Sequence, residues 1–218
     1  MKSWQVIHDD FRAALPSIAA EVLITDPVWP NCPPGAIEGH DRPHDLFAEM
    51  VAAMPQTITR AVIVMRSDSD PAMLAPMSAR LPFKQMCWLR YAMPSYLGRV
   101  LGGNEVAYCY GEHIPVERGR RVVPSIGPVA QPGDRPRNGH PMSRALVHFK
   151  WLVDWWSLPG ETIVDPYCGS ATTGVAALTL GRHFVGIETD ARWVPIARNR
   201  LADSERQGDM LVNAGDAP

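Results

Sequence analysis

The chain has 218 residues, of which 46% are hydrophobic and 20% charged, and its formal net charge is −2. This length and apolar content can bury the core of a single domain and exclude a disordered protein. Because no apolar run approaches the roughly 20 residues of a membrane span, we expect no membrane partner, and residues 1–10 lack the pattern of a signal peptide. The net charge excludes a uniformly basic nucleic-acid binder but leaves room for a local basic patch.

The cysteine and histidine residues form no metal-binding pattern. The four cysteines are far apart and make no C-x-x-C pair: Cys32, Cys87, Cys109 and Cys168. We therefore expect inert thiols rather than a zinc module or a disulfide framework, in keeping with a cytoplasmic location. His40, Asp41 and His44 lie in a Pro- and Gly-rich loop that would be a poor chelate, so no metal site is predicted.

The first half of the sequence alternates apolar runs with loops. Short apolar runs predict buried strands. The first of these runs ends at Asp26-Pro27, because proline cannot donate a hydrogen bond to a strand ladder. A cluster of prolines and glycines predicts a loop, and apolar residues at helical spacing predict a helix. The predicted elements are strands at 21–25, 60–65, 83–91 and 105–110, a loop at 30–43 and a helix at 45–54.

The second half changes from an irregular segment to a regular alternation. Residues 111–139 are rich in proline and glycine without a sustained period, which predicts a long irregular insert. The elements predicted after it are a helix capped by Ser143 and reaching Trp156, strands at 162–164 and 184–187, and helices at 174–180 and 191–201. Strands and helices in alternation predict an α/β fold with a doubly wound, mostly parallel sheet and right-handed crossovers.

The most informative stretch follows the predicted strand 162–164. Residues 165–174 form a turn rich in glycine and hydroxyl groups that leads directly into a helix, which is where open α/β sheets bind nucleotides. The stretch has neither the Gly-Lys-Ser/Thr of a P-loop nor the G-x-G-x-x-G spacing, so a polyphosphate or a dinucleotide has no dedicated cradle. An NAD-dependent oxidoreductase is disfavoured for the same reason.

A carboxylate at the end of the next strand suits a nucleoside. Glu188 ends the predicted strand 184–187, where an acidic side chain can accept hydrogen bonds from ribose hydroxyls. S-adenosylmethionine is a nucleoside cofactor without phosphates, and Asp165, Ser170, Thr172 and Thr173 could serve its polar end. The alternative is a tight strand-to-helix turn in which the hydroxyls cap the helix and Glu188 is merely solvated.

A second strand end carries another set of reactive groups. Asp26-Pro27-Val28-Trp29 combines a carboxylate, a rigid turn and an aromatic ring. A carboxylate and a backbone carbonyl that accept the two N–H bonds of an exocyclic amine would make its nitrogen a better nucleophile, and Trp29 would stack on a base flipped out of the duplex. Taken alone, the same string is typical of a strand-ending turn with a core tryptophan.

Together, these motifs resemble those of the DNA N6-adenine/N4-cytosine methyltransferases of the β arrangement, in which the catalytic motif precedes the cofactor motif. The family patterns D-P-P-Y/W, H-P-x-x-K/R, D-P-F-x-G-S-G-T-T and G-I-E are similar to residues 26–29, 140–144, 165–173 and 186–188. Residues 87–90 and 104–105 also resemble the family's W-x-K and H-E stretches. The likeness covers nearly the whole chain and is densest over 138–201.

The resemblance implies a Rossmann-like, S-adenosylmethionine-dependent methyltransferase domain over 1–218 that methylates an exocyclic amine of double-stranded DNA. Adenine N6 is favoured, with cytosine N4 as the alternative, and the enzymes of restriction-modification systems are the implied setting. The implied catalytic residues are Asp26, Pro27 and Trp29. The implied cofactor-binding residues are His140, Asp165, Tyr167, Gly169, Ser170, Thr172, Thr173 and Glu188.

The resemblance also assigns the loops. Residues 30–44 correspond to a flap beside the target base, and residues 111–139 to a target-recognition insert. The expected phosphate contacts are Arg42, Arg118, Arg120, Arg121, Arg135 and Arg137.

The sequence departs from the family pattern in two places and has a short insert. Val28 replaces the second proline of the catalytic motif, and Ala171 replaces a glycine of the cofactor motif. Three alternatives therefore stay open: low sequence specificity, help from a partner chain such as a second copy in a homodimer, and lost activity in a cofactor- or nucleic-acid-binding protein. Methylation of RNA or of a small amine is a further alternative.

Overall fold

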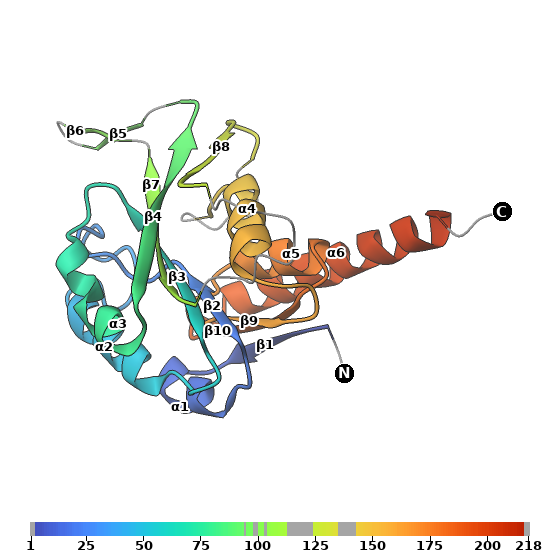
Figure 1. The fold of residues 1–218 in the computed structure, drawn as a ribbon, viewed down its shortest axis with the longest axis horizontal. Coiled ribbons are helices and arrows are strands. Elements are labelled where there is room, and N and C mark those ends of the chain that lie inside the picture. Colours follow the sequence, from blue (N-terminus) through green and yellow to red (C-terminus); the bar gives the residue numbers. More distant parts are fainter. Residues whose placement is uncertain are drawn as a thin grey trace.

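The computed structural model describes residues 3–93, 95–97, 100–102, 104–112, 124–134 and 143–215. These residues form an eight-stranded sheet of order β1-β10-β9-β2-β3-β7-β4-β8 and a separate hairpin of β5 and β6 (Figure 1). The sheet strands are β1 Trp4–His8, β2 Val22–Thr25, β3 Arg60–Arg66, β4 Phe83–Tyr91, β7 Glu105–Gly111, β8 Ile126–Ala130, β9 Thr162–Asp165 and β10 His183–Glu188. The hairpin strands are β5 Ser95–Leu97 and β6 Val100–Gly102.

The sheet is mostly parallel, as the sequence predicts. Strands β1, β10, β9, β2 and β3 pair in parallel, and β4 pairs in parallel with β8. Only β7 is antiparallel to its neighbours β3 and β4 in the described sheet. The β2–β9 ladder joins Val22 to Ile163 and Leu23 to Val164, and just beyond it the Thr25 hydroxyl donates to the Asp165 carboxylate.

Helices cover both faces of the sheet. Helices α1 Phe11–Ala14, α2 Pro43–Ala53 and α3 Ala75–Arg80 pack on one face, and α4 Leu146–Trp156, α5 Thr172–Thr179 and α6 Trp193–Gly215 on the other (Figure 1). Short 3₁₀ turns at Leu15–Ser17 and Pro71–Leu74 extend α1 and precede α3. Among the described residues no helix is both long and apolar enough to cross a bilayer.

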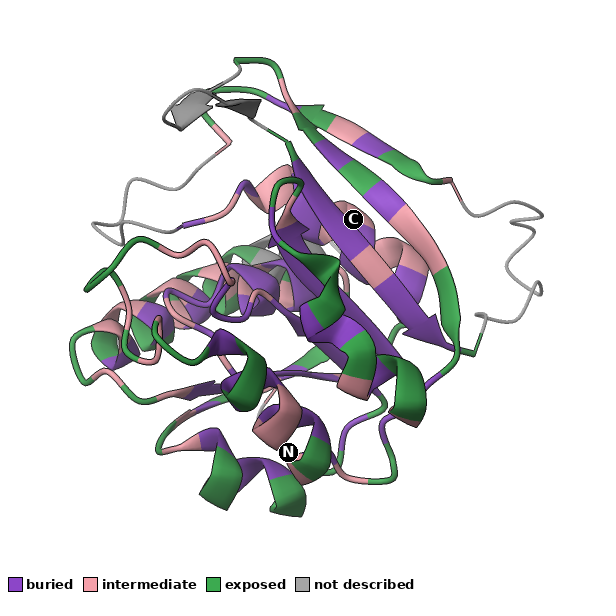
Figure 2. Cartoon of the chain, turned by 90° about the vertical axis from the view of Figure 1, so that its left-hand side faces the viewer, coloured by how far each residue is buried: buried purple, intermediate pink, exposed green. Residues whose placement is uncertain are grey.

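The core divides into two apolar layers because side chains alternate along the strands. Leu23 and Ile63 belong to the layer under α1, α2 and α3, whereas Ile24 and Val62 belong to the layer under α4, α5 and α6. All four side chains are fully buried, and Figure 2 shows central strands that are buried almost throughout. A sheet covered on both faces explains why these strands are continuous apolar runs in the sequence.

Several elements differ from the sequence-based expectation. The sequence predicted neither β1, which contains the polar residues Gln5 and His8, nor the short helices α1 and α3. The insert 111–139 was expected to be irregular, yet it contains β8. Pro128 obscures this strand in the sequence, but it is tolerated because β8 is the terminal strand of the sheet.

Two helix boundaries also need correction. Ser143 is not the N-cap of α4, because the helix begins at Leu146 with Ala145 as its N-cap and no capping side chain. The Ser143 hydroxyl instead lies 3.2 Å from that of Ser170. Helix α6 begins at Trp193 and extends well beyond the predicted end at residue 201, because neither glycine nor proline occurs in the segment 202–207 that follows.

Candidate active site

A cavity of about 1040 Å³ opens where four neighbouring parallel strands end. Its walls come from the carboxyl ends of β1, β10, β9 and β2 and from the segments that follow them. From β9 the chain passes through α5 to β10 on one side, and from β2 it passes through α2 to β3 on the other. The cavity therefore lies at the topological switch point of the sheet, where α/β proteins bind ligands.

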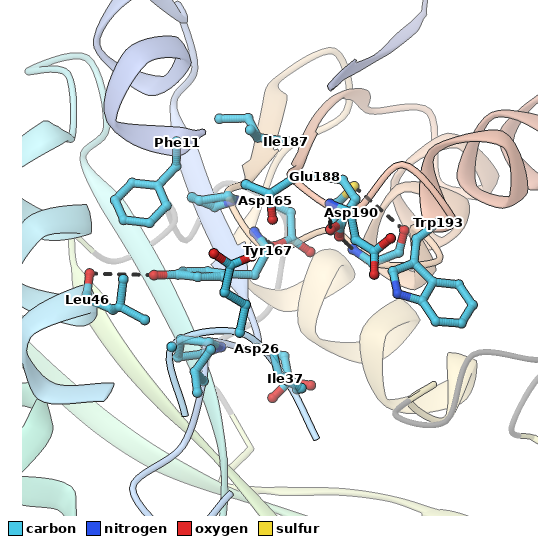
Figure 3. Close-up of a pocket in the computed structure, with 18 of the residues that line it drawn as sticks. Phe11, Asp26, Ile37, Leu46, Asp165, Tyr167, Ile187, Glu188, Asp190 and Trp193 are labelled. Atoms are coloured by element: carbon cyan, nitrogen blue, oxygen red, sulfur yellow. Dashed lines mark hydrogen bonds between the residues drawn. The ribbon is translucent and has the colours of Figure 1, made fainter. Parts of the chain in front are cut away.

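The cavity brings together most of the site residues predicted from the sequence. Figure 3 shows Asp26, Tyr167 and Glu188 arranged around it. The predicted residues that line it are Asp26, Pro27, Trp29, Arg42, Asp165, Tyr167, Gly169, Ser170, Thr172, Thr173 and Glu188. The remaining predictions, His140, Arg118, Arg120, Arg121, Arg135 and Arg137, lie outside the described residues.

Asp165 anchors the loop between β9 and α5. Its Oδ1 accepts hydrogen bonds from the Thr25 hydroxyl at 2.7 Å and from the backbone N–H of Tyr167 at 3.1 Å. Its Oδ2 accepts one from the Thr173 hydroxyl at 2.6 Å. Burial raises the pKa of Asp165 to about 6, although these hydrogen bonds oppose the shift. Both oxygens are thus occupied by the protein, and the carboxylate holds β2, the loop and α5 together.

The backbone of the loop turns sharply toward the cavity. Gly169 has a φ of 49° and Ala171 a φ of 59°, so both are in the left-handed region, which is unfavourable for alanine. A hydrogen bond of 2.7 Å from the Ala171 N–H to the Cys168 carbonyl closes the turn. Gly186 on β10 lies beneath it, where a Cβ atom would come within 2.8 Å of the Cys168 side chain. The glycine of the G-I-E motif therefore lets the loop lie directly on β10.

Glu188 joins this loop to the segment after β10. Its Oε2 accepts a hydrogen bond from the Gly169 N–H at 2.8 Å, and its Oε1 accepts one from the Asp190 N–H at 2.8 Å. Burial raises the pKa of Glu188. Each carboxylate oxygen has a further lone pair, so the group can still accept hydrogen bonds from a ligand in the cavity that it lines.

Asp26 has a different environment from Asp165. Its Oδ2 accepts a 2.5 Å hydrogen bond from Nε of Arg144, and its buried Oδ1 has no hydrogen-bond partner among the described residues. Burial raises the pKa of Asp26 to about 7; Arg144 opposes this shift, while Glu105 and Asp165 add to it. A buried carboxylate with an unused oxygen is costly to the fold, which makes Asp26 a candidate for contact with a ligand.

Trp29 is buried and its ring is covered by Arg144. The exposed fraction of Trp29 is 4%, and its indole N–H donates to the Val64 carbonyl at 3.2 Å. The Arg144 guanidinium carbon lies 4.1 Å from the centre of the ring. The ring that the sequence analysis assigned to a flipped base is therefore stacked against a side chain of the protein.

Arg144 and Glu105 also belong to the site, although neither was predicted as a site residue from the sequence. Arg144 Nη1 donates to Glu105 Oε1 at 3.2 Å, and the Tyr91 hydroxyl donates to Glu105 Oε2 at 2.8 Å. Both residues belong to stretches that resemble family motifs, so a signal was present. Arg144 contacts both Asp26 and Glu105 and so joins three distant parts of the sequence, which no local pattern could reveal.

Residues after β1 and in the predicted flap complete the cavity. Phe11 lines it and packs against Tyr167, with ring centres 5.4 Å apart. The Tyr167 hydroxyl donates to the Leu46 carbonyl at 3.5 Å, as the dashed line in Figure 3 shows. Arg42, expected to contact phosphate, is paired with Glu49 at 3.2 Å and lines the cavity with a partly exposed side chain.

Comparisons with known sequences find DNA methyltransferases. A family model described as DNA methylase matches residues 97–199. Over 62 residues, 28% of the chain, the sequence is 52% identical to the type II methyltransferase M2.DpnII of Streptococcus pneumoniae. It is 36% identical over 62 residues to the DNA adenine methyltransferase YhdJ of Escherichia coli (strain K12). These matches span only 23% and 21% of the length of the two relatives.

Comparisons with solved structures cover almost the whole chain. The M1.HpyAVI–SAM complex superposes with a TM-score of 0.71 and 18% identity, over 91% of this chain and 98% of that one. The cytosine-N4-specific PvuII DNA methyltransferase gives a TM-score of 0.68 with 14% identity, over 94% and 92% of the two chains. TTHA0409 of Thermus thermophilus, complexed with S-adenosylmethionine, gives 0.61 with 19% identity, over 92% and 95%. These likenesses confirm the predicted Rossmann-like α/β fold.

Proposed function

We propose that this chain, which resembles the DNA N6-adenine/N4-cytosine methyltransferases in both sequence and fold, transfers a methyl group to an exocyclic amine of a DNA base. The observation that carries the proposal is the placement of Asp26 and the Gly169 loop on one cavity. The Asp26 carboxylate can accept hydrogen bonds from an amine, and the Gly169 loop is a turn of the kind that holds a nucleoside. The names of both curated relatives support a methyltransferase, and that of YhdJ supports adenine.

The residues of the cavity fit S-adenosylmethionine. The cavity of about 1040 Å³ has room for a nucleoside cofactor and part of a second ligand. Glu188 would hold the ribose, Phe11 and Ile187 would provide an apolar wall, and the backbone and hydroxyls of 169–173 would hold the polar tail. When bound, this cofactor supplies an electrophilic methyl group on a sulfonium.

Asp26 would prepare the amine for transfer. Its carboxylate and the Pro27 carbonyl would accept the two N–H bonds, so that the nitrogen lone pair is less delocalised into the base. As the nitrogen–carbon bond forms, the carbon–sulfur bond breaks and its electron pair stays on sulfur. The methylated nitrogen then loses one proton, and a carboxylate with a pKa of about 7 can accept it at neutral pH.

The finer assignments are part of the same proposal. Adenine N6 is the favoured target and cytosine N4 the alternative, because a structural neighbour is a cytosine-N4-specific enzyme. We further propose one domain over 1–218, a flap at 30–44, a target-recognition insert at 111–139, duplex DNA as substrate and a cytoplasmic, restriction-modification setting. Arg42 and the arginines of the insert (Arg118, Arg120, Arg121, Arg135 and Arg137) would contact phosphates.

Two measurements on the whole chain test the proposal. Calorimetry should detect binding of S-adenosylmethionine, and tritiated methyl groups should pass to unmethylated duplex DNA. Nucleoside mass spectrometry of DNA from expressing cells should then report N6-methyladenine. Cofactor binding without transfer would contradict the proposed activity, and label entering RNA or a small amine instead would contradict the substrate.

A further inference from the structure

Arg144 occupies the part of the cavity that the proposed reaction reserves for the target base. Its Nε lies 2.5 Å from Asp26 Oδ2, and its guanidinium carbon lies 4.1 Å from the centre of the Trp29 ring. The side chain is only 11% exposed. Arg144 therefore occupies both groups with which a flipped base would interact. These are the Trp29 ring, on which the base would stack, and the Asp26 carboxylate, which would accept hydrogen bonds from its amine.

A guanidinium can imitate an amino base because the two have similar shapes and donors. Both are flat, both stack on an aromatic ring, and both present N–H donors in their own plane. A buried carboxylate can therefore exchange one for the other without losing its hydrogen bond. Thymine has no exocyclic amine, and its one in-plane N–H donor lies between two carbonyl oxygens that a carboxylate would repel.

Arg144 also has a second carboxylate to hold it when it leaves Asp26. Its Nη1 donates to Glu105 Oε1 at 3.2 Å, and Glu105 is held by the Tyr91 hydroxyl at 2.8 Å. Glu105 is buried at the start of β7, whereas Asp26 follows β2. When the Arg144 guanidinium rotates away from the Trp29 ring, it thus keeps its ion pair with Glu105.

We propose that Arg144 is a specificity gate that fills the base site and is displaced only by a base that presents an exocyclic amine to Asp26. The inference rests on the proposed function, since it assumes that a base enters beside Asp26. Adenine and cytosine can replace the lost donor. Thymine presents a carbonyl oxygen in place of the exocyclic amine, and its one ring N–H lies between two carbonyls, so its entry would set a carbonyl oxygen against the Asp26 carboxylate, which a polar site rejects strongly.

Binding of free nucleosides tests the gate without requiring methyl transfer. The protein is labelled with 5-fluorotryptophan, the Trp29 resonance is assigned from its loss in Trp29→Phe, and 2′-deoxyadenosine or thymidine is titrated by ¹⁹F NMR. In the unmodified protein, deoxyadenosine should shift the Trp29 resonance and thymidine should not. In Arg144→Met, deoxyadenosine should bind about tenfold more tightly if the guanidinium fills the site nine-tenths of the time, and thymidine should also bind.

Two further variants make the result decisive. Arg206→Met removes an exposed arginine on α6, far from the cavity, and should behave like the unmodified protein. Arg144→Lys keeps the positive charge between Asp26 and Glu105 but lacks the planar group, so it should show a smaller gain in the same direction. If Arg144→Met does not fold, Arg144→Lys tests the gate on its own.

The outcomes separate the gate from the proposed function. Unchanged or weaker deoxyadenosine binding in both Arg144 variants would overturn the gate, even if the protein methylates DNA. Tighter binding with lost discrimination would support the gate, and absence of methyl transfer by the unmodified protein would then count only against the proposed reaction.

Discussion

The dipeptide Asp-Pro occurs at the carboxyl ends of two neighbouring parallel strands, as Asp26-Pro27 after β2 and as Asp165-Pro166 at the end of β9. Asp165 is buried and Asp26 is partly buried, with its Oδ1 away from solvent, and the partners of the two carboxylates differ. Asp165 accepts three hydrogen bonds from neutral donors of the protein, which use both of its oxygens. Asp26 has one oxygen on the Arg144 side chain and the other without a hydrogen-bond partner in the described residues.

The difference shows how the same local sequence serves structure in one place and chemistry in the other. Three fixed donors make Asp165 part of the framework. A single side-chain partner leaves Asp26 able to exchange that partner for a ligand. Burial raises the pKa of both groups, to about 6 for Asp165 and about 7 for Asp26. A carboxylate whose pKa is raised toward neutral pH and whose partner can be exchanged suits a reacting group.

The largest expected effect comes from removing the Asp26 carboxylate. Asp26→Ala should lower methyl transfer to DNA by about a thousandfold or more, because the amine loses its acceptor. Affinity for S-adenosylmethionine, measured by calorimetry, should change little, since Asp26 does not contact the Gly169 loop in the described structure. Comparable turnover in the variant would place the reacting group elsewhere.

The pH dependence of transfer tests the ionisation of Asp26. An ionised carboxylate accepts the amine hydrogens and a protonated one does not, so activity belongs to the form present above the pKa of about 7. The kcat/KM for DNA should rise about tenfold per pH unit below pH 7 and become constant above it. In Arg144→Met the rise should move to higher pH, because Arg144 lowers the pKa of Asp26. A flat profile from pH 5 to 8 would contradict this role.

On the structural side, Thr25→Val removes one of the donors to Asp165. The free energy of unfolding should fall by about 1.5–3 kcal/mol, the usual value for a hydrogen bond to a buried charged group, and urea denaturation measures it. Thr179→Val is the matched control, because this exposed hydroxyl only donates to a helical carbonyl, and its effect should stay within about 0.5 kcal/mol. Equal effects of the two variants would remove Asp165 from the framework.

The smallest effect is expected at Ala171. Because this alanine has a φ of 59°, Ala171→Gly should relieve strain and raise the free energy of unfolding by about 0.5–1 kcal/mol after the added entropy of the unfolded chain is subtracted. Ala176→Gly in the middle of α5 should instead destabilise the protein by about 1 kcal/mol. Thermal or urea denaturation compares them, and a destabilising Ala171→Gly would show that the turn is not strained.

Much of the fold could be predicted from the sequence because buried parallel strands are apolar along their whole length. The strands predicted at 21–25 and 60–65 match β2 Val22–Thr25 and β3 Arg60–Arg66 to within one residue. Strand β1 lacked this signal because polar residues interrupt it, and β8 was hidden by a proline that only the edge of a sheet accepts. Edge strands depend on their neighbours, so their own sequences say less about them.

The candidate site could be predicted as a set of residues but not as a set of contacts. The motifs placed Asp26, Asp165 and Glu188 on one edge of the sheet, and all three line the cavity. The ion pair of Asp26 with Arg144 joins residues 118 positions apart, so it depends on tertiary structure. The stacking of Arg144 on Trp29 depends on the same packing. No sequence period encodes such contacts.

The short ladder between β2 and β9 has a consequence for how two ligands could meet. The ladder ends at Leu23 and Val164, and just beyond it the hydroxyl of Thr25 donates to Asp165. The junction between β2 and β9 divides the sheet into a part that carries the Gly169 loop and a part that carries Asp26. Under the proposed function, the methyl donor would lie beside the Gly169 loop and the acceptor beside Asp26, on opposite sides of this junction. The hydrogen bond from Thr25 to Asp165 would then set the separation between the two sides.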